Sequence, residues 1–508
     1  MLRRVLLGFL CASLVVSPAH ATWSIVVVNR RTGEVAVGGA TCIARINLMS
    51  GLATVVPGVG AGVIQASGDS DDLLPMTEGF RARLDPSDIL DLVIAADSGP
   101  RLLQTGIVSL YPGAPVTFTG GGVGQAKKGV VGEVGDLAYA IQGNVLAGGA
   151  VIDAAERAVR DTPGDLSQKL LAGMVAAREF GGDGRCSCDF GRPDRCGSPP
   201  QSFEKSAHVG FLIVTRIGDD VPPCTVPNDC TQGRFHLRLN IRGADADERD
   251  PDPVDQLVER YATWRAARAG RPDGILSSVE AVDALPADGL TKRTVTVHLV
   301  DIEGVPLTHG GADVRVAGAD GARLHASVGP VSDLGDGRYR FTLTSTTRVG
   351  TDRLVIQAAD DLLDATLYPF LEVRSEAPRE LFVGVDALSA GRGGSAPFVL
   401  NRPDFAGGSY LLLASASGSQ PGTPLGRGTV LPLVRDGWFA LSLLHAGDPR
   451  VLPGTYGTLD AIGRAEASCE APAGALRSLI GRRLTCAAVL AQGARVATTP
   501  PVELEIGP

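Results

Sequence analysis

A threonine stands directly after a stretch with the features of an export signal. Ala19-His20-Ala21 is a small-residue cleavage pattern, so a cut after Ala21 would leave Thr22 as the first residue of the mature chain. A terminal threonine carries a hydroxyl nucleophile together with an α-amine, whose ordinary pKa of about 7.7 to 8.0 leaves it partly neutral at physiological pH. Thr22 could therefore attack a carbonyl group with its own amine as the base. The alternative stays open that Thr22 is only the residue that signal removal happens to leave.

The export signal is predicted to comprise residues 1–21. Arg3 and Arg4 form its basic start, 5–16 its short apolar stretch, and Pro18 precedes the small residues. This apolar stretch is too short for a membrane span, which needs roughly 18 residues or more. We therefore expect an exported protein that is periplasmic, extracellular or attached to the cell surface.

The composition excludes some classes of partner. The chain has 508 residues, 44% of them hydrophobic, which is enough for two to four domains, and no later stretch is apolar for long enough to span a membrane. The formal net charge of −9 becomes −11 once Arg3 and Arg4 leave with the signal, and no basic run stands out. Nucleic acid is therefore not an expected partner.

A threonine nucleophile needs hydrogen-bond donors for the oxyanion that develops in the transition state. Gln142-Gly143-Asn144 lies at the end of a predicted strand and before a predicted helix, and the Asn144 side chain could be such a donor. The equally open interpretation is a strand-to-helix turn in which Asn144 caps the helix.

Other catalytic and cofactor motifs are missing from the sequence. It has no G-x-S-x-G elbow, no H-E-x-x-H, no phosphate-binding loop and no dinucleotide fingerprint. His208 and His236 are better explained as half-buried residues of strands than as catalytic bases. The glycine cluster at 120–124 lacks the following helix and lysine of a phosphate cradle, so we interpret it as a loop. No cofactor is expected.

Eight cysteines remain after signal removal, and in an exported protein disulfides are the default for such a set. They are Cys42, Cys186, Cys188, Cys196, Cys224, Cys230, Cys469 and Cys486. The competing interpretation is a metal site in the loop from Cys186 to Cys196. Its C-x-C spacing differs from the C-x2-C of zinc knuckles and the loop has no histidine, so no metal is expected.

The cysteine spacings favour three pairings. Cys224 lies close to Cys230, Cys469 lies close to Cys486, and one bridge is expected inside the Cys186 to Cys196 loop, which also holds Cys188. Cys42 stands alone in an early strand and has no expected partner. Connectivity beyond this does not follow from spacing.

The first part of the chain, 22–270, mixes strands and helices. Strands are predicted at 22–28, 34–41, 60–66, 104–110, 137–142, 207–215 and 235–241. Helices are predicted from Asp85-Pro86 to Gly99, over 150–160 and 166–179, and from Asp252-Pro253 to before Gly270. Strand pairs and helix pairs in this order favour two sheets packed between helices.

From about Gly289 onward helix signals vanish and alternation of apolar and polar residues takes over. We predict a polar linker at 271–288, an immunoglobulin-like β-sandwich at 289–375 and a second all-β domain at 378–508. In the last domain, strands are predicted at 381–385, 409–414, 429–433 and 439–444. Neither C-terminal domain has a catalytic signature.

An ordered series of short motifs carries a resemblance to a known family. The series is Thr22-x-Ser24-Ile25-Val26, Thr32-Gly33-Glu34-x-Ala36-Val37, Val59-Gly60-Ala61-x-x-x-Gln65-Ala66, Gly106-Ile107-Val108, Ile141-Gln142-Gly143-Asn144, Gly181-Gly182-Asp183 and Asp252-Pro253-Val254. Over residues 22–268 the chain resembles the domain of unknown function 1028 family. Asp336-Gly337-Arg338-Tyr339 is weakly similar to immunoglobulin-like modules of bacterial surface proteins.

The first resemblance implies a fold and a mechanism. The family is grouped with the N-terminal nucleophile hydrolases, so an α+β fold is expected, a four-layer αββα sandwich, followed here by the two β-sandwich domains. Proteasome-type relatives tune the threonine with a lysine, but Gly39-Ala40-Thr41-Cys42 has none where family members tend to carry a Ser-Lys pair. Arg45 could supply that positive charge, and a surface arginine is the alternative.

Two hypotheses about function follow. In the first, the protein is an exported amidohydrolase in which Thr22 attacks an amide or peptide bond, with Asn144 as an oxyanion donor and Arg45 as the nearby cation. In the second, the same fold is a non-catalytic binding or structural module of a surface protein, whose partner would be a cell-surface polymer. The sequence identifies neither the substrate nor the oligomeric state.

Overall fold

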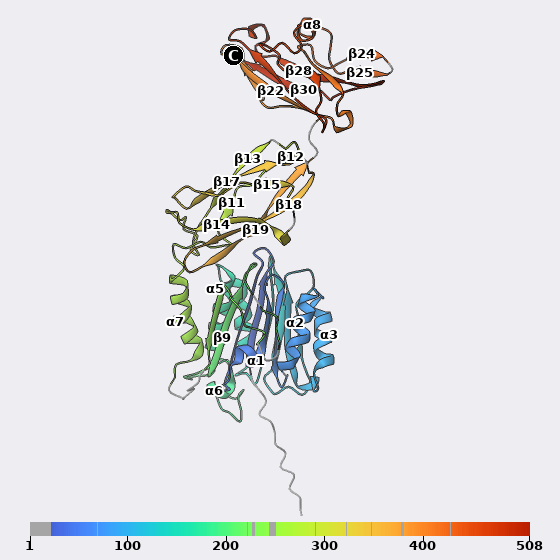
Figure 1. Cartoon of the computed structure of the whole chain (residues 1–508). Helices are drawn as coiled ribbons and strands as arrows, with labels where there is room; N and C mark the ends of the chain where they lie inside the picture. The colour runs from blue at the N-terminus through green and yellow to red at the C-terminus, as the bar shows by residue number, and fades with distance from the viewer. Residues whose placement is uncertain are drawn as a thin grey trace, which may run out of the picture.

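The computed structural model describes residues 22–508 except 69, 221, 226–228, 243–249, 290, 322, 347, 377–379 and 427. The expected signal peptide, 1–21, lies outside the described residues. Three units follow one another along the molecule: an N-terminal unit of helices and strands, a middle β unit and a C-terminal β unit (Figure 1).

The N-terminal unit is built around a six-stranded antiparallel sheet in the order β10-β9-β2-β1-β8-β7. Its strands are β1 (Thr22–Asn29), β2 (Glu34–Thr41), β7 (Lys128–Val134), β8 (Leu137–Asn144), β9 (Val209–Thr215) and β10 (Leu237–Ile241). β1, β2, β8 and β9 are buried along almost their whole length, because both faces of this sheet are covered.

A second antiparallel sheet, in the order β3-β4-β5-β6, packs against one face of the first. Its strands are β3 (Ala53–Val56), β4 (Gly60–Ala66), β5 (Leu103–Ser109) and β6 (Val116–Thr119). Between the two sheets lies an apolar core that includes Val26 and Val37 from the first sheet and Val63 and Val108 from the second.

Helices cover the outer face of each sheet (Figure 1). α4 (Ala150–Asp161), α5 (Leu166–Glu179) and α7 (Pro253–Ala266) pack on the six-stranded sheet, and α2 (Leu73–Arg81) and α3 (Pro86–Ala96) pack on the four-stranded sheet. The short helices of this unit are α1 (Leu48–Leu52), α6 (Gly184–Ser187), η1 (Ser70–Asp72) and η2 (Pro100–Leu102). The mixed content of helix and strand agrees with the sequence prediction.

The middle unit is a pair of β-sheets. One contains β11 (Ser278–Val279), β13 (Lys292–His298), β15 (Ala326–Val328), β16 (Ser332–Asp333) and β17 (Arg338–Ser345), and the other contains β12 (Leu285–Pro286), β14 (Asp313–Gly318), β18 (Gly350–Ala359) and β19 (Asp364–Glu376). One 3-10 turn, η4 (Ala319–Gly321), follows β14. The segment expected to be a linker, 271–288, supplies β11 and β12 to these sheets, because its apolar residues Val279 and Leu285 pack in the sandwich core.

The C-terminal unit has two facing sheets and a separate hairpin. One sheet contains β20 (Leu381–Val383), β22 (Gly394–Asn401) and β27 (Arg464–Ala471). The other contains β21 (Ala387–Ser389), β23 (Ser409–Ser415), β26 (Tyr456–Thr458), β28 (Arg483–Gln492), β29 (Arg495–Thr498) and β30 (Val502–Gly507). The hairpin is β24 (Thr423–Gly426) and β25 (Thr429–Leu431), and the helical turns are η5 (Pro403–Phe405) and η6 (Arg477–Leu479).

The prediction of a strand at 439–444 is wrong, because this segment belongs to helix α8 (Gly437–Leu444). The Asp436 side chain accepts a hydrogen bond from the backbone N–H of Phe439, and this N-cap starts the helix. A run of apolar residues without alternation fits a strand and a helix equally well, so the cap decides.

The N-terminal and middle units meet at a buried ion-pair group. The Arg216 guanidinium lies 2.9 Å from Glu34 Oε1 and 2.7 Å from Asp273 Oδ2, and all three side chains are at least 90% buried. Around them is a cavity of about 200 Å³ whose lining includes Asp219, His236 and Arg216 from the N-terminal unit and Thr366 from the middle unit. These contacts join the two units directly.

His236 gives this seam a dependence on pH. Burial lowers the pKa of His236 well below its ordinary value, and its Nε2 atom has no hydrogen-bond partner among the described residues. The unfolded chain takes up a proton below about pH 6.5 while the folded chain does not, so stability is lost as the pH falls below that value. Burial also raises the pKa of the neighbouring Asp219 to about 6. Between about pH 6 and 4 the folded chain therefore holds a proton that the unfolded chain has lost, so Asp219 adds stability as the pH falls through this range.

We predict that His236→Phe removes one of these two effects. Phe keeps the ring that packs against Trp264 and keeps the backbone N–H that donates to Asp219, so the Asp219 contribution cancels in the comparison. Between pH 7 and pH 5, the wild type should lose about 2 kcal/mol of unfolding free energy relative to the variant. Urea unfolding of both proteins across this range measures it, and parallel pH profiles would contradict the assignment to His236.

Candidate functional site

Thr22 lies at one end of the six-stranded sheet, in a row with residues of the neighbouring strands. Backbone pairing sets Thr22 of β1 opposite Asn144 of β8. On the other side, Trp23 pairs with Ala40, which brings Thr41 of β2 level with Thr22. Two residues that the sequence singled out, Thr22 and Asn144, are therefore direct neighbours.

The side chains of this row face the second sheet. Ser24, two residues after Thr22 and on the same face, donates from Oγ to Gln65 Oε1 of β4 at 2.7 Å. Gln65 Nε2 donates in turn to the backbone oxygen of Thr22 at 3.1 Å. Thr22 is 2% exposed and stands where the space between the two sheets ends.

Three glutamines from three strands form a buried polar network beside Thr22. Gln104 Oε1 of β5 accepts from Gln65 Nε2 at 2.6 Å and from Asn144 Nδ2 at 3.1 Å. Gln142 Nε2 of β8 donates to Ser24 Oγ at 2.7 Å. Because each of these amides has at least one partner on the other sheet or on β1, the network fixes the sheets against each other at this end.

Asn144 keeps unused hydrogen-bonding capacity within this network. One proton of its Nδ2 is used by Gln104, and its Oδ1 is buried with no hydrogen-bond partner among the described residues. The second Nδ2 proton has no acceptor in the described contacts. A side-chain amide held by one bond, with one N–H left over, has the properties of an oxyanion donor.

A buried ion pair lies at the same end of the sheet. The Asp183 carboxylate accepts hydrogen bonds from Arg185 Nη2 at 2.8 Å and from the backbone N–H of Cys42 at 2.8 Å, and both side chains of the pair are at least 95% buried. Burial raises the pKa of Asp183, and the Arg185 guanidinium opposes that shift. Arg185 Nη2 also lies 3.4 Å from Thr41 Oγ1, so a fixed positive charge reaches the row of Thr22.

Arg45, the cation expected from the resemblance, is exposed in the loop after β2, with a φ of +64°. None of its described contacts joins it to Thr22 or Asn144.

His208 precedes β9, and its backbone N–H donates to the Thr41 oxygen at 2.8 Å, so it stands one residue beyond the row. The glycine cluster at 120–124 forms a loop between β6 and β7, as predicted.

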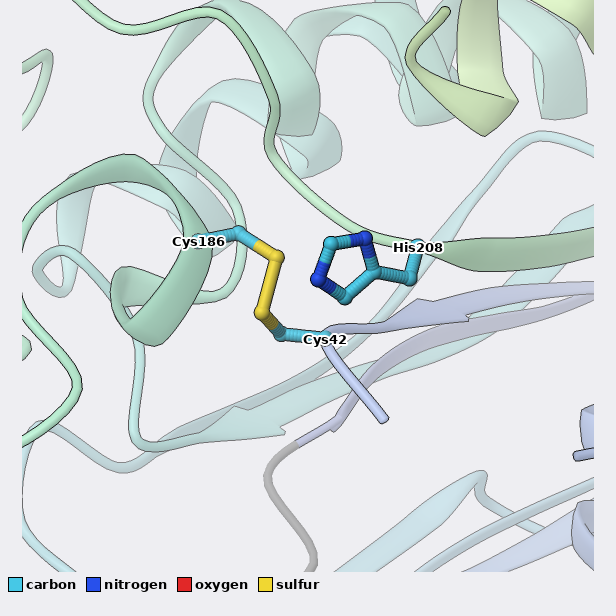
Figure 2. Close-up of side chains that lie close together, drawn as sticks. All are labelled: Cys42, Cys186 and His208. Carbon is cyan, nitrogen blue, oxygen red and sulfur yellow. A yellow bond between two sulfur atoms is a disulfide. The ribbon is translucent and has the colours of Figure 1, made fainter. Parts of the chain in front are cut away.

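A disulfide closes this end of the sheet. Cys42, directly after β2, is bonded to Cys186 of α6, and Figure 2 shows the His208 imidazole beside the two sulfur atoms. Two further disulfides join Cys188 to Cys196 and Cys224 to Cys230. The Cys224–Cys230 pairing and the bridge inside the Cys186 to Cys196 loop were predicted from spacing.

Two expectations about the cysteines are wrong. Cys42 is paired, with a residue 144 positions away that only the folded chain brings near. Cys469 of β27 and Cys486 of β28 are free thiols that lie in facing sheets of the C-terminal unit. Nearness in sequence does not fix whether two Cβ atoms end within the short reach of a disulfide. Burial raises the pKa of Cys469 to about 11.

One group of residues has the composition of a metal site. Cys42, Cys186 and His208 offer ligand atoms that lie within 4.8 Å of one another. Zinc is bound by thiolates, however, and here the two sulfur atoms are bonded to each other. In this state the group is a disulfide beside an imidazole.

Sequence reasoning missed Gln104 and Arg185. Gln104 breaks an otherwise apolar and β-branched strand, as Gln65 and Gln142 do, and a buried amide in such a strand is a signal of a polar network. Arg185 directly follows Gly181-Gly182-Asp183-Gly184, but its pairing with Asp183 and its reach to Thr41 depend on the turn of α6.

Comparison with known proteins finds two family matches, one in the N-terminal unit and one in the middle unit. Residues 22–188 match the family of unknown function DUF1028. The match ends at 188, whereas the sequence resemblance extends to 268. Residues 275–366 match Invasin, domain 3, which covers most of the middle unit. No curated protein is similar enough to count as a match.

Three solved structures are similar to parts of the chain. A DUF1028 protein of Silicibacter pomeroyi has 19% identity over 48% of this chain and 88% of its own, with a TM-score of 0.35. The Yersinia pseudotuberculosis adhesin InvE has 18% identity over 45% of this chain and 58% of its own, with a TM-score of 0.19. The Escherichia coli adhesin FdeC has 10% identity over 97% of this chain and 98% of its own, with a TM-score of 0.20.

Proposed function

We propose that the N-terminal unit is an amide-bond hydrolase of the N-terminal nucleophile type, with Thr22 as the nucleophile once residues 1–21 are removed. The observation that carries the proposal is the register of β1 and β8, which sets Asn144 opposite Thr22 at the end of the space between two sheets. The expected four-layer αββα fold is part of the same proposal and is supported by helices on the outer face of each sheet.

In the proposed reaction, the Thr22 hydroxyl attacks the substrate carbonyl while its α-amine takes the proton. The negative charge that develops on the carbonyl oxygen is met by the free N–H of Asn144. Gln104 positions Asn144, and the Arg185 guanidinium lies near Thr41 where the resemblance led us to expect a lysine. Arg185 thus replaces Arg45 as the proposed cation of the site.

Export from the cytoplasm is part of the proposal. Three disulfides among the described residues favour an oxidising compartment, and the match to Invasin, domain 3, favours a cell-surface setting. No helix in the described part of the chain has the length and apolar character needed to cross a membrane. The two β units would then hold the N-terminal unit away from a surface.

The second candidate function is non-catalytic binding at a cell surface. The match of residues 275–366 to Invasin, domain 3, favours it, because the middle unit would then be part of a binding stalk. Its partner would be a cell-surface polymer or a protein, and Thr22 would have no chemical role.

The test is covalent labelling of the processed protein with acyl electrophiles such as a β-lactone, followed by peptide mapping. Label on Thr22 would support the hydrolase, and its absence with several electrophiles would favour the binding protein. Asn144→Ala should slow labelling by roughly 10²- to 10³-fold, the cost of losing one oxyanion donor. Thr119→Val is the matched control, because it removes a 2.9 Å hydrogen bond from Gln104 in the same network and leaves Asn144 intact. An equal loss of rate in both variants would contradict the role of Asn144.

A further inference from the structure

The sheet that carries β23 and β28 in the C-terminal unit is apolar on both faces. Leu412 and Leu490 point into the sandwich core, while Leu411 and Val489, one residue away in each strand, lie on the outer face. The outer face of a sandwich sheet is normally polar. This outer face therefore has to be covered by something apolar.

The chain covers only part of it. Phe439 of α8 and Leu431 of β25 pack on Leu413 and form a small separate core. Beside this core an open groove of about 760 Å³ remains, with Leu411 and Val489 in its floor. Its walls come from α8, the β24–β25 hairpin and β26, through Leu443, Leu425 and Tyr456.

Helix α8 presents three of its leucines to the outside. Its buried residue is Ser442, whose Oγ accepts a hydrogen bond from the backbone N–H of Ala414 at 3.1 Å. Leu441, Leu443 and Leu444 are 47%, 51% and 77% exposed. The apolar side chains of a helix usually pack inward, as Phe439 does here, and these three leucines depart from that arrangement. The helix lies at the end of the molecule farthest from the N-terminal unit (Figure 1).

Two charged side chains, Arg435 and Asp436, line the groove. Arg435 is exposed, lines the groove, and forms no ion pair with any residue in the described part of the chain. The neighbouring Asp436 carboxylate is already used by the backbone N–H groups of Ala416, Ser417 and Phe439. The groove thus combines an apolar trough with one available positive charge.

We propose that this groove binds a single long-chain fatty acid, with the acyl chain over Leu411 and Val489 and the carboxylate at Arg435. An extended peptide laid on the sheet face would bury N–H and C=O groups without partners, because the backbone groups of β23 and β28 are used in their own ladder. An acyl chain needs no such partners. A flat lipid surface would not fill a concave trough.

The experiment is titration of the full-length protein with cis-parinaric acid, whose fluorescence rises in an apolar site, and competition with palmitate and with the alcohol of equal chain length. We expect saturable binding of one equivalent. Leu443→Glu should weaken binding at least tenfold, and Ile480→Glu, a change at an equally exposed position (50%) outside the groove, should leave it unchanged. Arg435→Gln should weaken binding of the acid about threefold and leave the alcohol unaffected.

Four outcomes would overturn the proposal: no saturable binding, equal losses in Leu443→Glu and Ile480→Glu, binding to phosphatidylcholine vesicles without binding of the monomeric acid, or a dimer in light scattering that Leu443→Glu dissociates. The third would make α8 a membrane contact, and the fourth would make it an interface with a second copy.

Discussion

Thr22→Ala should abolish covalent labelling by acyl electrophiles, a loss of more than about 10³-fold, while the N-terminal unit stays folded. The substitution removes one hydroxyl and one methyl group, and the backbone pairing of Thr22 with Asn144 does not depend on its side chain. Without the hydroxyl no acyl bond can form at this position. Mass spectrometry of the processed protein after exposure to a β-lactone measures the labelled fraction.

Two variants separate loss of the nucleophile from damage to the site. Thr22→Ser keeps a hydroxyl and an α-amine and should still be labelled. Thr41→Ala removes the hydroxyl of the residue level with Thr22 on β2 and should be labelled as well. Persistent label on the Thr22→Ala protein would move the nucleophile to another residue, and Ser24 would then be the first to map.

Arg216→Met should cost about 3 to 5 kcal/mol of unfolding free energy. It leaves the Glu34 and Asp273 carboxylates, which are 2% and 3% exposed, without their shared cation. Removing one partner of a buried ion pair leaves an uncompensated buried charge, and that penalty is large. Because Asp273 begins the middle unit, the seam between the two units should loosen in the same variant. Urea unfolding followed by tryptophan fluorescence measures the loss.

The control for Arg216→Met is the triple variant Arg216→Met/Glu34→Gln/Asp273→Asn. It has no buried charge left at this position, so most of the lost stability should return. The Asp273→Asn change keeps a side-chain oxygen that can accept from the backbone N–H groups of Ile275 and Leu276, as the carboxylate does. A triple variant as unstable as the single one would show that packing of the Arg216 side chain, rather than charge, holds the seam.

Local patterns predicted much of the N-terminal unit. The sequence prediction placed β2, β4 and α5 at 34–41, 60–66 and 166–179, which are their observed bounds, because alternation, flanking glycines and a 3.6-residue apolar period mark them clearly. It did not include α2 (Leu73–Arg81) or β7 (Lys128–Val134). β7 lies at the edge of its sheet and is mostly half-buried or exposed, so it has little apolar pattern to detect.

The candidate site was predictable only in part. Thr22 and Asn144 were predicted from chemistry, and the register of β1 with β8 places them side by side. The Cys42–Cys186 disulfide and the Arg185 contact with Thr41 join segments more than 140 residues apart, which no local pattern encodes. Gln104 acts through partners on β4 and β8, so its role needed the packing of one sheet on the other.

The N-terminal residue of the protein after export, determined by intact mass or Edman sequencing, decides whether Thr22 can act as a terminal nucleophile. The proposed chemistry requires a free α-amine on Thr22, so the mature chain should begin with Thr22. A mature chain that begins at His20, or beyond Thr22, would contradict the proposal that Thr22 is a terminal nucleophile.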